Sequence, residues 1–154
     1  MPRIAAERLV PGSTPHDVAA LWWDTSRWPS FVEGFSHVRK REEPWPQAGG
    51  RLVWDARPES DRGRVIERVL RRDAEGAEVA LEDARLDGTQ RVAFAAARDG
   101  TLATLELEYA LKSPAAAVVD LAFVRRRLRR GLERTLERLA REVAMERELT
   151  REVQ

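Results

Sequence analysis

The sequence contains no cysteine and only two histidines, His16 and His37. The lack of cysteine excludes a disulfide scaffold, a thiolate zinc site and a cysteine nucleophile. Two histidines without a nearby acidic cluster do not form a metal site. The chain also lacks a Gly-rich phosphate loop, a GxSxG elbow and an HExxH helix, which argues against common hydrolase, kinase and dinucleotide chemistry. We therefore expect neither a metal nor a cofactor.

A long apolar run and an excess of charge of one sign are missing as well. No stretch reaches the 18 or so apolar residues of a membrane span, and the opening MPRIAAERLV is too short and polar for a signal-peptide core. With 27 basic and 26 acidic residues, the formal charge is only +1, so no global field attracts nucleic acid or anionic lipid. These absences predict a cytoplasmic protein without an integral membrane segment and without a nucleic-acid partner.

The sequence does contain enough apolar material for one folded domain. Hydrophobic residues make up 43% of the 154 residues and charged residues 34%, and the low net charge argues against disorder. The length suits one domain and is short for two. We expect a single domain over residues 1–154, in which residues from about 144 onward form a frayed helical tail.

The first part of the chain predicts strands separated by short helices. Residues 3–10 predict a first strand, and Thr14 followed by Pro15 is typical of a capped helix start. This short helix is expected to end near Asp24, and a second helical turn is expected at 26–32. Further strands are predicted at about 35–43, 51–57, 63–72, 78–86, 89–97 and 101–111, which gives about seven antiparallel strands.

Two hairpin signals and one long amphipathic helix complete the pattern. Asp87-Gly88 and Asp99-Gly100 are typical hairpin turns. After Pro114 the hydrophobic period changes from 2 to 3.6, which predicts a helix over about 115–150. Its apolar stripe consists of Val118, Leu121, Leu128, Leu132, Leu136, Leu139 and Val143. Only this helix can cover the concave face of a curved sheet, so we predict an α+β fold with room for a ligand between sheet and helix.

Two stretches of the sequence carry a resemblance to a known family. The opening RIAAERLVPGSTPHDVAALWWDTSRWPSFVEG resembles the start of the START/Bet v 1-like (SRPBCC) superfamily, in its polyketide cyclase/dehydrase branch. The run GTLATLELEYAL and the Arg-rich FVRRRLRRGLERTLERLARE are also similar to that family. The resemblance covers nearly the whole chain and implies a helix-grip fold with a hydrophobic cavity beneath the long helix. Family members include cyclases, aromatases, lipid carriers and hormone receptors, so the resemblance implies a fold more sharply than a function.

Aromatic and aliphatic side chains provide candidate cavity walls. Trp28, Phe31 and Phe35 lie between the helices and the sheet, where the resemblance implies a pocket entrance; lining and core packing both remain open. Trp54 lies in mid-strand and could be a ligand-stacking wall or a core residue. Further apolar candidates for ligand binding are Phe94, Leu107, Leu121 and Leu128.

Polar residues on the strands decide whether the cavity has chemistry. Glu67 alternates with Val65 and Val69, but the opposite phase of that strand is also apolar, so its facing remains open. Asp83 and Arg85 form either an inward acid–base pair or a pair facing solvent. A buried pair of this kind requires desolvation and tends to mark function.

Two further polar residues are candidate ligand anchors. Tyr109 shares a strand face with Leu105 and Leu107, so its ring is expected inside with a hydroxyl that needs a partner. Arg125 falls on the apolar stripe of the long helix, from which it could meet a carboxylate or phenolate of a ligand.

These candidates support three interpretations of function. The first is a carrier or sensor that binds a lipid-like or polycyclic, polyketide-like molecule, anchored by Tyr109 and Arg125. The second is a cyclase/dehydrase-type enzyme for aldol cyclisation or dehydration, with Glu67, Asp83 or Tyr109 as candidate catalytic residues. The family's aromatase/cyclases carry a pocket arginine on a strand, and the matching strand here ends in Arg57, whose direction remains open.

The third interpretation is a protein–protein module that uses the Arg/Glu-rich C-terminal helix. For the first two, the expected partner is a hydrophobic small molecule. The chain itself is expected to be a monomer or a weak homodimer.

Overall fold

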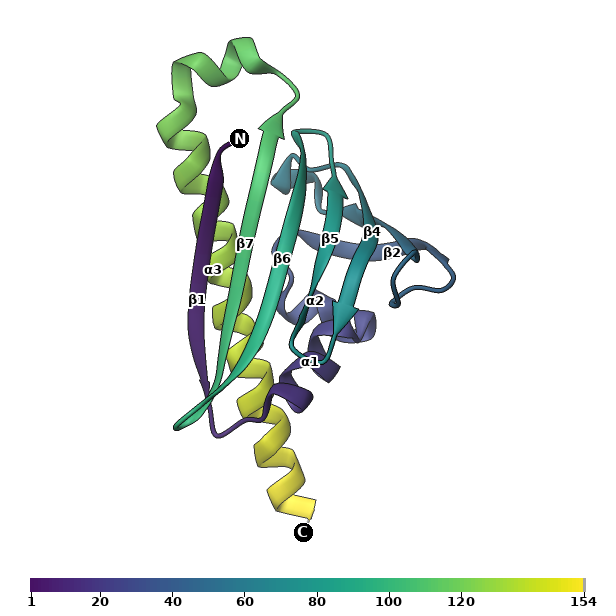
Figure 1. Cartoon of the computed structure of the whole chain (residues 1–154), viewed down its shortest axis with the longest axis vertical. Coiled ribbons are helices and arrows are strands. Elements are labelled where there is room, and N and C mark those ends of the chain that lie inside the picture. Colours follow the sequence, from purple (N-terminus) through teal and green to yellow (C-terminus); the bar gives the residue numbers. More distant parts are fainter. Residues whose placement is uncertain (154) are drawn as a thin grey trace.

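The computed structural model describes residues 1–153, and for 114–120 it describes the backbone only. Figure 1 shows a twisted antiparallel sheet with the long helix α3 along one face. The elements are β1 (Arg3–Pro11), α1 (Pro15–Trp23), α2 (Trp28–Phe31), β2 (Phe35–Glu42), β3 (Arg51–Ala56), β4 (Arg64–Asp73), β5 (Gly76–Glu82), β6 (Leu86–Ala97), β7 (Gly100–Leu111) and α3 (Pro114–Val153). Two single 3-10 turns lie at Thr25–Arg27 and Pro58–Ser60.

The seven strands have the order β1-β7-β6-β5-β4-β3-β2. Every neighbouring pair is antiparallel. Strands β1 and β2 are consecutive in sequence but lie at opposite edges, and α1 and α2 form the connection between them. The predicted α+β helix-grip fold is confirmed.

The two short helices follow from local capping and apolar spacing. The Thr14 hydroxyl accepts a hydrogen bond from the backbone N–H of Asp17 at 3.2 Å, and Pro15 is the first helical residue. Such a cap satisfies a donor that the first helical turn would otherwise leave unpaired. Together α1 and α2 bury Val18, Leu21, Trp22, Trp28 and Phe31, and these side chains close one end of the concave side.

The predicted turn at Asp87-Gly88, between β5 and β6, is wrong. Strand β5 ends at Glu82 and β6 begins at Leu86, so Asp87 and Gly88 are strand residues. The turn is formed by Asp83, whose Oδ1 accepts the backbone N–H groups of Arg85 and Leu86 at 2.8 and 3.1 Å. An aspartate side chain can thus define a turn without a following glycine. The second predicted hairpin is present, with its two-residue turn at Arg98 and Asp99 and with Gly100 as the first residue of β7.

Helix α3 lies against the sheet through its apolar stripe, of which Leu128, Leu132, Leu136, Leu139 and Val143 are buried. Leu121 departs from the prediction, because 52% of its surface is exposed. Helical periodicity defines a face, but burial also requires a neighbouring element at that height. The Val118 side chain lies outside the described residues.

The end of α3 is helical. The helix continues to Val153, and the predicted fraying from about 144 onward stays a prediction. Most side chains beyond Val143 are exposed, and Figure 1 shows the C-terminal turns projecting past the sheet. Among the described residues, no helix combines the length and the apolarity needed to cross a membrane.

Candidate functional site

A cavity of about 350 Å³ lies between the concave face of the sheet and the middle of α3. This volume falls in the range of small-molecule sites. Its apolar lining comes from the short helices, the sheet and α3, and consists of Trp22, Trp28, Val32, Trp54, Leu81, Leu86, Leu105, Leu107, Leu128 and Leu132.

Charged side chains form the other part of the lining. Among these charged side chains, the arginines outnumber the acids. The charged lining consists of Arg57, Arg62, Arg85, Arg127, Arg134 and Arg138 with Glu33, Glu59, Glu67 and Asp83, and Ser60, Gln90 and Thr135 add neutral polar groups.

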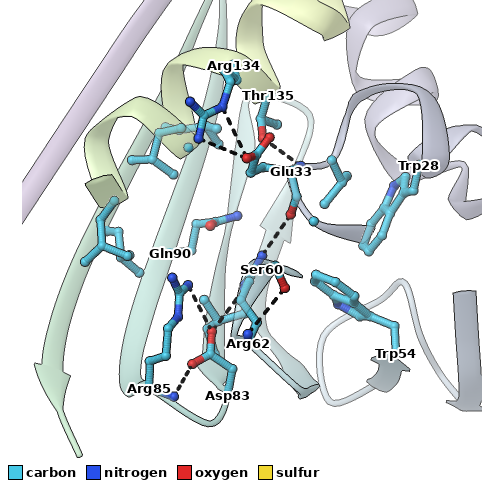
Figure 2. Close-up of a pocket in the computed structure, with 18 of the residues that line it drawn as sticks. Trp28, Glu33, Trp54, Ser60, Arg62, Asp83, Arg85, Gln90, Arg134 and Thr135 are labelled. Carbon is cyan, nitrogen blue, oxygen red and sulfur yellow. Dashed lines mark hydrogen bonds and ion pairs between the residues drawn. The ribbon is translucent and has the colours of Figure 1, made fainter. Parts of the chain in front are cut away.

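Trp54 forms the aromatic wall of the cavity. It projects inward from β3 with 1% of its surface exposed and contacts the Phe35 ring at a centroid distance of 5.2 Å. The Arg62 guanidinium lies over the Trp54 ring, 4.9 Å from its centroid. This stacking is a cation–π contact, which positions the guanidinium at the cavity surface. Figure 2 shows Trp28 and Trp54 side by side at one end of the pocket.

Glu67 faces inward, because it lines the cavity beside the buried Val65 and Val69. The Trp54 indole Nε1 donates a hydrogen bond to the Glu67 carboxyl. Burial raises the pKa of Glu67, while that hydrogen bond and the positive charge of Arg62 lower the pKa by smaller amounts. The environment therefore favours the uncharged carboxyl.

Asp83 is buried at the end of β5 and binds two arginines from the lining. Its Oδ2 accepts from Arg62 Nε at 3.0 Å and lies 3.5 Å from an Arg85 terminal nitrogen. Burial lowers the pKa of Arg85, the Asp83 charge opposes that shift, and the positive charge of Arg62 adds to it. Of the two alternatives that the sequence left open, the inward acid–base pair is the one present, with Arg62 as a third member.

Glu33 connects α3 to the loops at the mouth of the cavity. Its backbone N–H donates to the Thr135 hydroxyl at 3.1 Å, and its carboxylate pairs with Arg134 and Arg138, each at 2.9 Å. Its carbonyl accepts from Arg62 at 3.2 Å. Figure 2 shows this group of contacts above the Asp83 cluster.

The structure brings together only part of the predicted site. The residues that line the cavity are Trp28, Trp54, Glu67, Asp83, Arg85, Leu107 and Leu128. Phe31, Phe35, Phe94 and Tyr109 are buried in the core but are not part of the lining. Arg57 lies at the mouth, where its Nε donates to the Phe35 carbonyl at 3.1 Å.

Two predicted positions are wrong in their facing. Arg125 is exposed and Leu121 is half exposed, and neither lines the cavity. Arg125 lies three residues before Leu128, which places it about 60° around the helix from that buried residue. This offset is enough to direct a long polar side chain to solvent.

Sequence reasoning missed several polar residues of the lining. Gln90 lies on the same inward face of β6 as Val92 and Phe94. A polar residue that alternates with apolar ones along a strand is the sequence pattern that could have identified it. Arg62 lies in a loop without periodicity, and no local pattern marks it. Among the described residues, no group of three or more histidines and acids is arranged to hold a metal ion.

Comparisons with known proteins agree with this architecture. A search of curated proteins found no match. A similar solved structure is a protein of Thermus thermophilus, with a TM-score of 0.75, 21% identity, and coverage of 94% of this chain and 98% of that one. A START superfamily protein from Mycobacterium smegmatis has a TM-score of 0.75 at 16% identity, with coverage of 93% and 97%.

A third similar structure is the di-domain ARO/CYC StfQ from the steffimycin biosynthetic pathway, with a TM-score of 0.73 and 17% identity. The match covers 94% of this chain and 51% of StfQ. In sequence, residues 1–144 match the family described as "Polyketide cyclase / dehydrase and lipid transport". Because this match spans nearly the whole chain, the protein belongs to the polyketide cyclase/dehydrase and lipid transport family.

Proposed function

We propose that the protein binds an apolar small molecule, lipid-like or polycyclic, between the sheet and α3, and acts as a carrier or sensor. The observation that carries this proposal is the cavity of about 350 Å³ with Trp28, Trp54 and several leucines in its walls. Apolar surface moved from water into such walls contributes about 25 cal/mol per Å². A cavity with these walls therefore favours a ligand with an apolar body.

Gly131 of α3 gives independent support. It lines the cavity within the helix, where glycine costs about 1 kcal/mol relative to alanine. A Cβ atom at this position would meet only the Glu33 Cγ, at an ordinary contact distance of 3.7 Å. Packing therefore does not require glycine here, and its effect is to leave space at the mouth of the cavity.

The first test is to look for a ligand directly. Native mass spectrometry of freshly purified protein should release an apolar small molecule, and the neutral dye N-phenylnaphthylamine should bind with enhanced fluorescence. A protein that neither releases a small molecule nor binds the dye would contradict the proposal.

The second test narrows the mouth of the cavity through Gly131. We expect Gly131→Leu to weaken dye binding by about ten-fold or more, equivalent to about 1.4 kcal/mol, because the larger side chain occupies ligand space. Gly131→Ala is the matched control, since it has the same gain in helix propensity with little added volume. Equal dye affinity in the two variants would place the dye outside this cavity.

Glu67 favours a second candidate function, a cyclase/dehydrase-type enzyme. A buried carboxyl with a raised pKa is a candidate general acid–base group. The ionised form of Glu67, which the raised pKa makes a stronger base, would take a proton from the carbon next to a ketone. The enolate carbon would then attack a second carbonyl carbon. The proton would then return from Glu67 to the new alkoxide, while Arg62 stabilises the negative charge on oxygen. Removal of the second proton from the same carbon by Glu67, with departure of the hydroxyl group as water, would give the enone.

This candidate is tested with an acyclic diketone whose aldol condensation gives a cyclohexenone. Wild-type protein should accelerate the appearance of enone absorbance, and Glu67→Gln should abolish the acceleration while dye binding is kept. Equal rates with the two proteins would leave the carrier or sensor function alone.

A further inference from the structure

The charges around Asp83 do not balance. Asp83 is fully shielded from solvent, and its Oδ1 is already occupied by the backbone N–H groups of Arg85 and Leu86. Its remaining oxygen faces the guanidinium groups of both Arg62 and Arg85. One carboxylate therefore opposes two positive charges at the edge of the cavity.

Arg85 is the less compensated of the two arginines. Arg62 donates to Asp83 and to the Glu33 carbonyl and stacks on Trp54. Arg85 makes one long contact of 3.5 Å with Asp83, and its buried Nε has no hydrogen-bond partner among the described residues. A guanidinium has five N–H donors, and a buried donor without an acceptor is costly. This Nε has no accessible surface, but 26% of the Arg85 side chain is exposed. An acceptor from outside the protein can therefore reach the terminal nitrogens of the guanidinium.

The other groups of the lining do not supply the missing negative charge. Glu67 is a further acid of the sheet, and burial raises its pKa and so favours its uncharged form. Glu33 is already paired with Arg134 and Arg138, and Arg127 is paired with Asp61 outside the lining. Glu59, the remaining acid of the lining, lies exposed in the Pro58–Ser60 turn. The cavity therefore has an excess of positive charge in its polar half.

Gln90 lies on the inner face of β6 in the same lining. In the view of Figure 2, the Arg85 side chain extends from Asp83 toward Gln90. Because both side chains line the same cavity, a guanidinium and an amide N–H₂ can donate to one ligand group. Leu81, Leu105 and Leu107 form apolar walls of the same cavity.

We infer that the ligand of this cavity is an apolar molecule with a single oxyanion group, such as a carboxylate, which binds between Arg85 and Gln90. Its apolar body lies against Trp54 and the leucines of the sheet. This inference rests on the proposed function and names the chemical class of ligand that the same cavity selects.

The test compares two dyes with the same aromatic body. Anilinonaphthalene sulfonate carries one oxyanion, and N-phenylnaphthylamine is neutral. Wild-type protein should bind the anionic dye about ten-fold more tightly or better, as expected for one charge-assisted hydrogen bond in a buried site. Arg85→Gln should remove this preference by weakening the anionic dye alone, and the neutral dye should keep its affinity.

The matched control is Arg125→Gln, which removes the same charge from an exposed position of α3. It should leave both dye affinities within about two-fold, the range of small surface effects. Equal losses in Arg85→Gln and Arg125→Gln, or no loss in Arg85→Gln, would overturn the inference. Failure of the neutral dye to bind wild-type protein would instead overturn the proposed function.

Arg85→Gln is expected to fold, because Asp83 keeps its two backbone donors and Arg62. Gln90→Leu provides a second variant that changes no charge. It should weaken the anionic dye several-fold and leave the neutral dye bound at least as well. An unchanged preference for the anionic dye in Gln90→Leu would remove Gln90 from the site.

Discussion

Glu67 and Asp83 are two carboxyl groups of one cavity with opposite environments. Asp83 accepts two backbone N–H groups and faces two guanidinium groups. Glu67 accepts one indole N–H in a setting where desolvation dominates its pKa.

The raised pKa of Glu67 has a consequence for stability. The folded protein keeps a proton on Glu67 at pH values where the unfolded chain has released it, so this group lowers stability as pH rises above the unfolded pKa of about 4.3. Glu67→Gln removes the effect and keeps an acceptor for Trp54. We expect the variant to gain stability relative to wild type as pH rises above about 4, by about 1.4 kcal/mol per unit of pKa elevation.

Urea unfolding across this pH range measures the difference. The gain should develop from the acid side and then level off above the folded pKa of Glu67. Parallel stability profiles for wild type and Glu67→Gln would show that the carboxyl is ionised in the folded protein.

The sequence predicts which way a side chain faces when the residue belongs to a regular strand or helix pattern. Glu67 was a candidate because it alternates with buried valines, and Asp83 with Arg85 because they follow Val79 and Leu81. Arg62 was missed because a loop residue has no phase. Arg125 was misplaced because a few tens of degrees around a helix decide between cavity and solvent.

The α2–β2 loop and α3 are separate elements joined at the cavity mouth by Glu33. Each pair that Glu33 makes is partly exposed, so its contribution to global stability is at most about 1 kcal/mol. Local opening of the loop is more sensitive than global unfolding, because both arginine pairs connect the loop directly to α3. We expect Glu33→Gln to raise amide hydrogen exchange in residues 32–34 while β6 and β7 are unaffected.

Hydrogen-exchange mass spectrometry measures this difference. The matched control is Glu137→Gln, which breaks the Arg141 pair within α3 and connects no two elements. Equal exchange of the loop in both variants would show that Glu33 does not restrain the mouth.

The sequence predicted the elements better than their junctions. The strands and helices were expected because their apolar periods are regular over many residues. The β5–β6 turn was misplaced because Asp83 forms it through a side-chain acceptor, and an Asp-Gly pair four residues later gave a stronger local signal.

The whole molecule has a core that ends before the chain does. Among the described residues, Val143 is the last buried one of α3, and Met145, Leu149 and Val153 are more than half exposed. An ion pair joins the tail to the body, between Glu146 and Arg27 at 2.8 Å, and Glu142 pairs with the same arginine. We expect removal of residues 145–154 to lower the free energy of unfolding by about 1 kcal/mol or less.

Dye affinity should be unchanged in this shortened protein, since none of the tail residues that the structure describes lines the cavity. Sedimentation gives a second readout, because the interaction-module interpretation assigns this helix a partner. A wild-type protein that sediments as a dimer and a shortened protein that sediments as a monomer would show that the exposed apolar residues of the tail bind a second copy.

The position of β1 has a kinetic consequence for a chain made from its N-terminus. Arg3 pairs with Glu108 and Pro11 with Gly100, so the first strand must wait for a partner synthesised about one hundred residues later. Closing so long a loop lowers the entropy of the chain before any contact compensates. The hairpins from β4 to β7 are local and can form earlier, whereas β1 joins the sheet last. Until then, the β7 edge to which β1 binds is open to other chains.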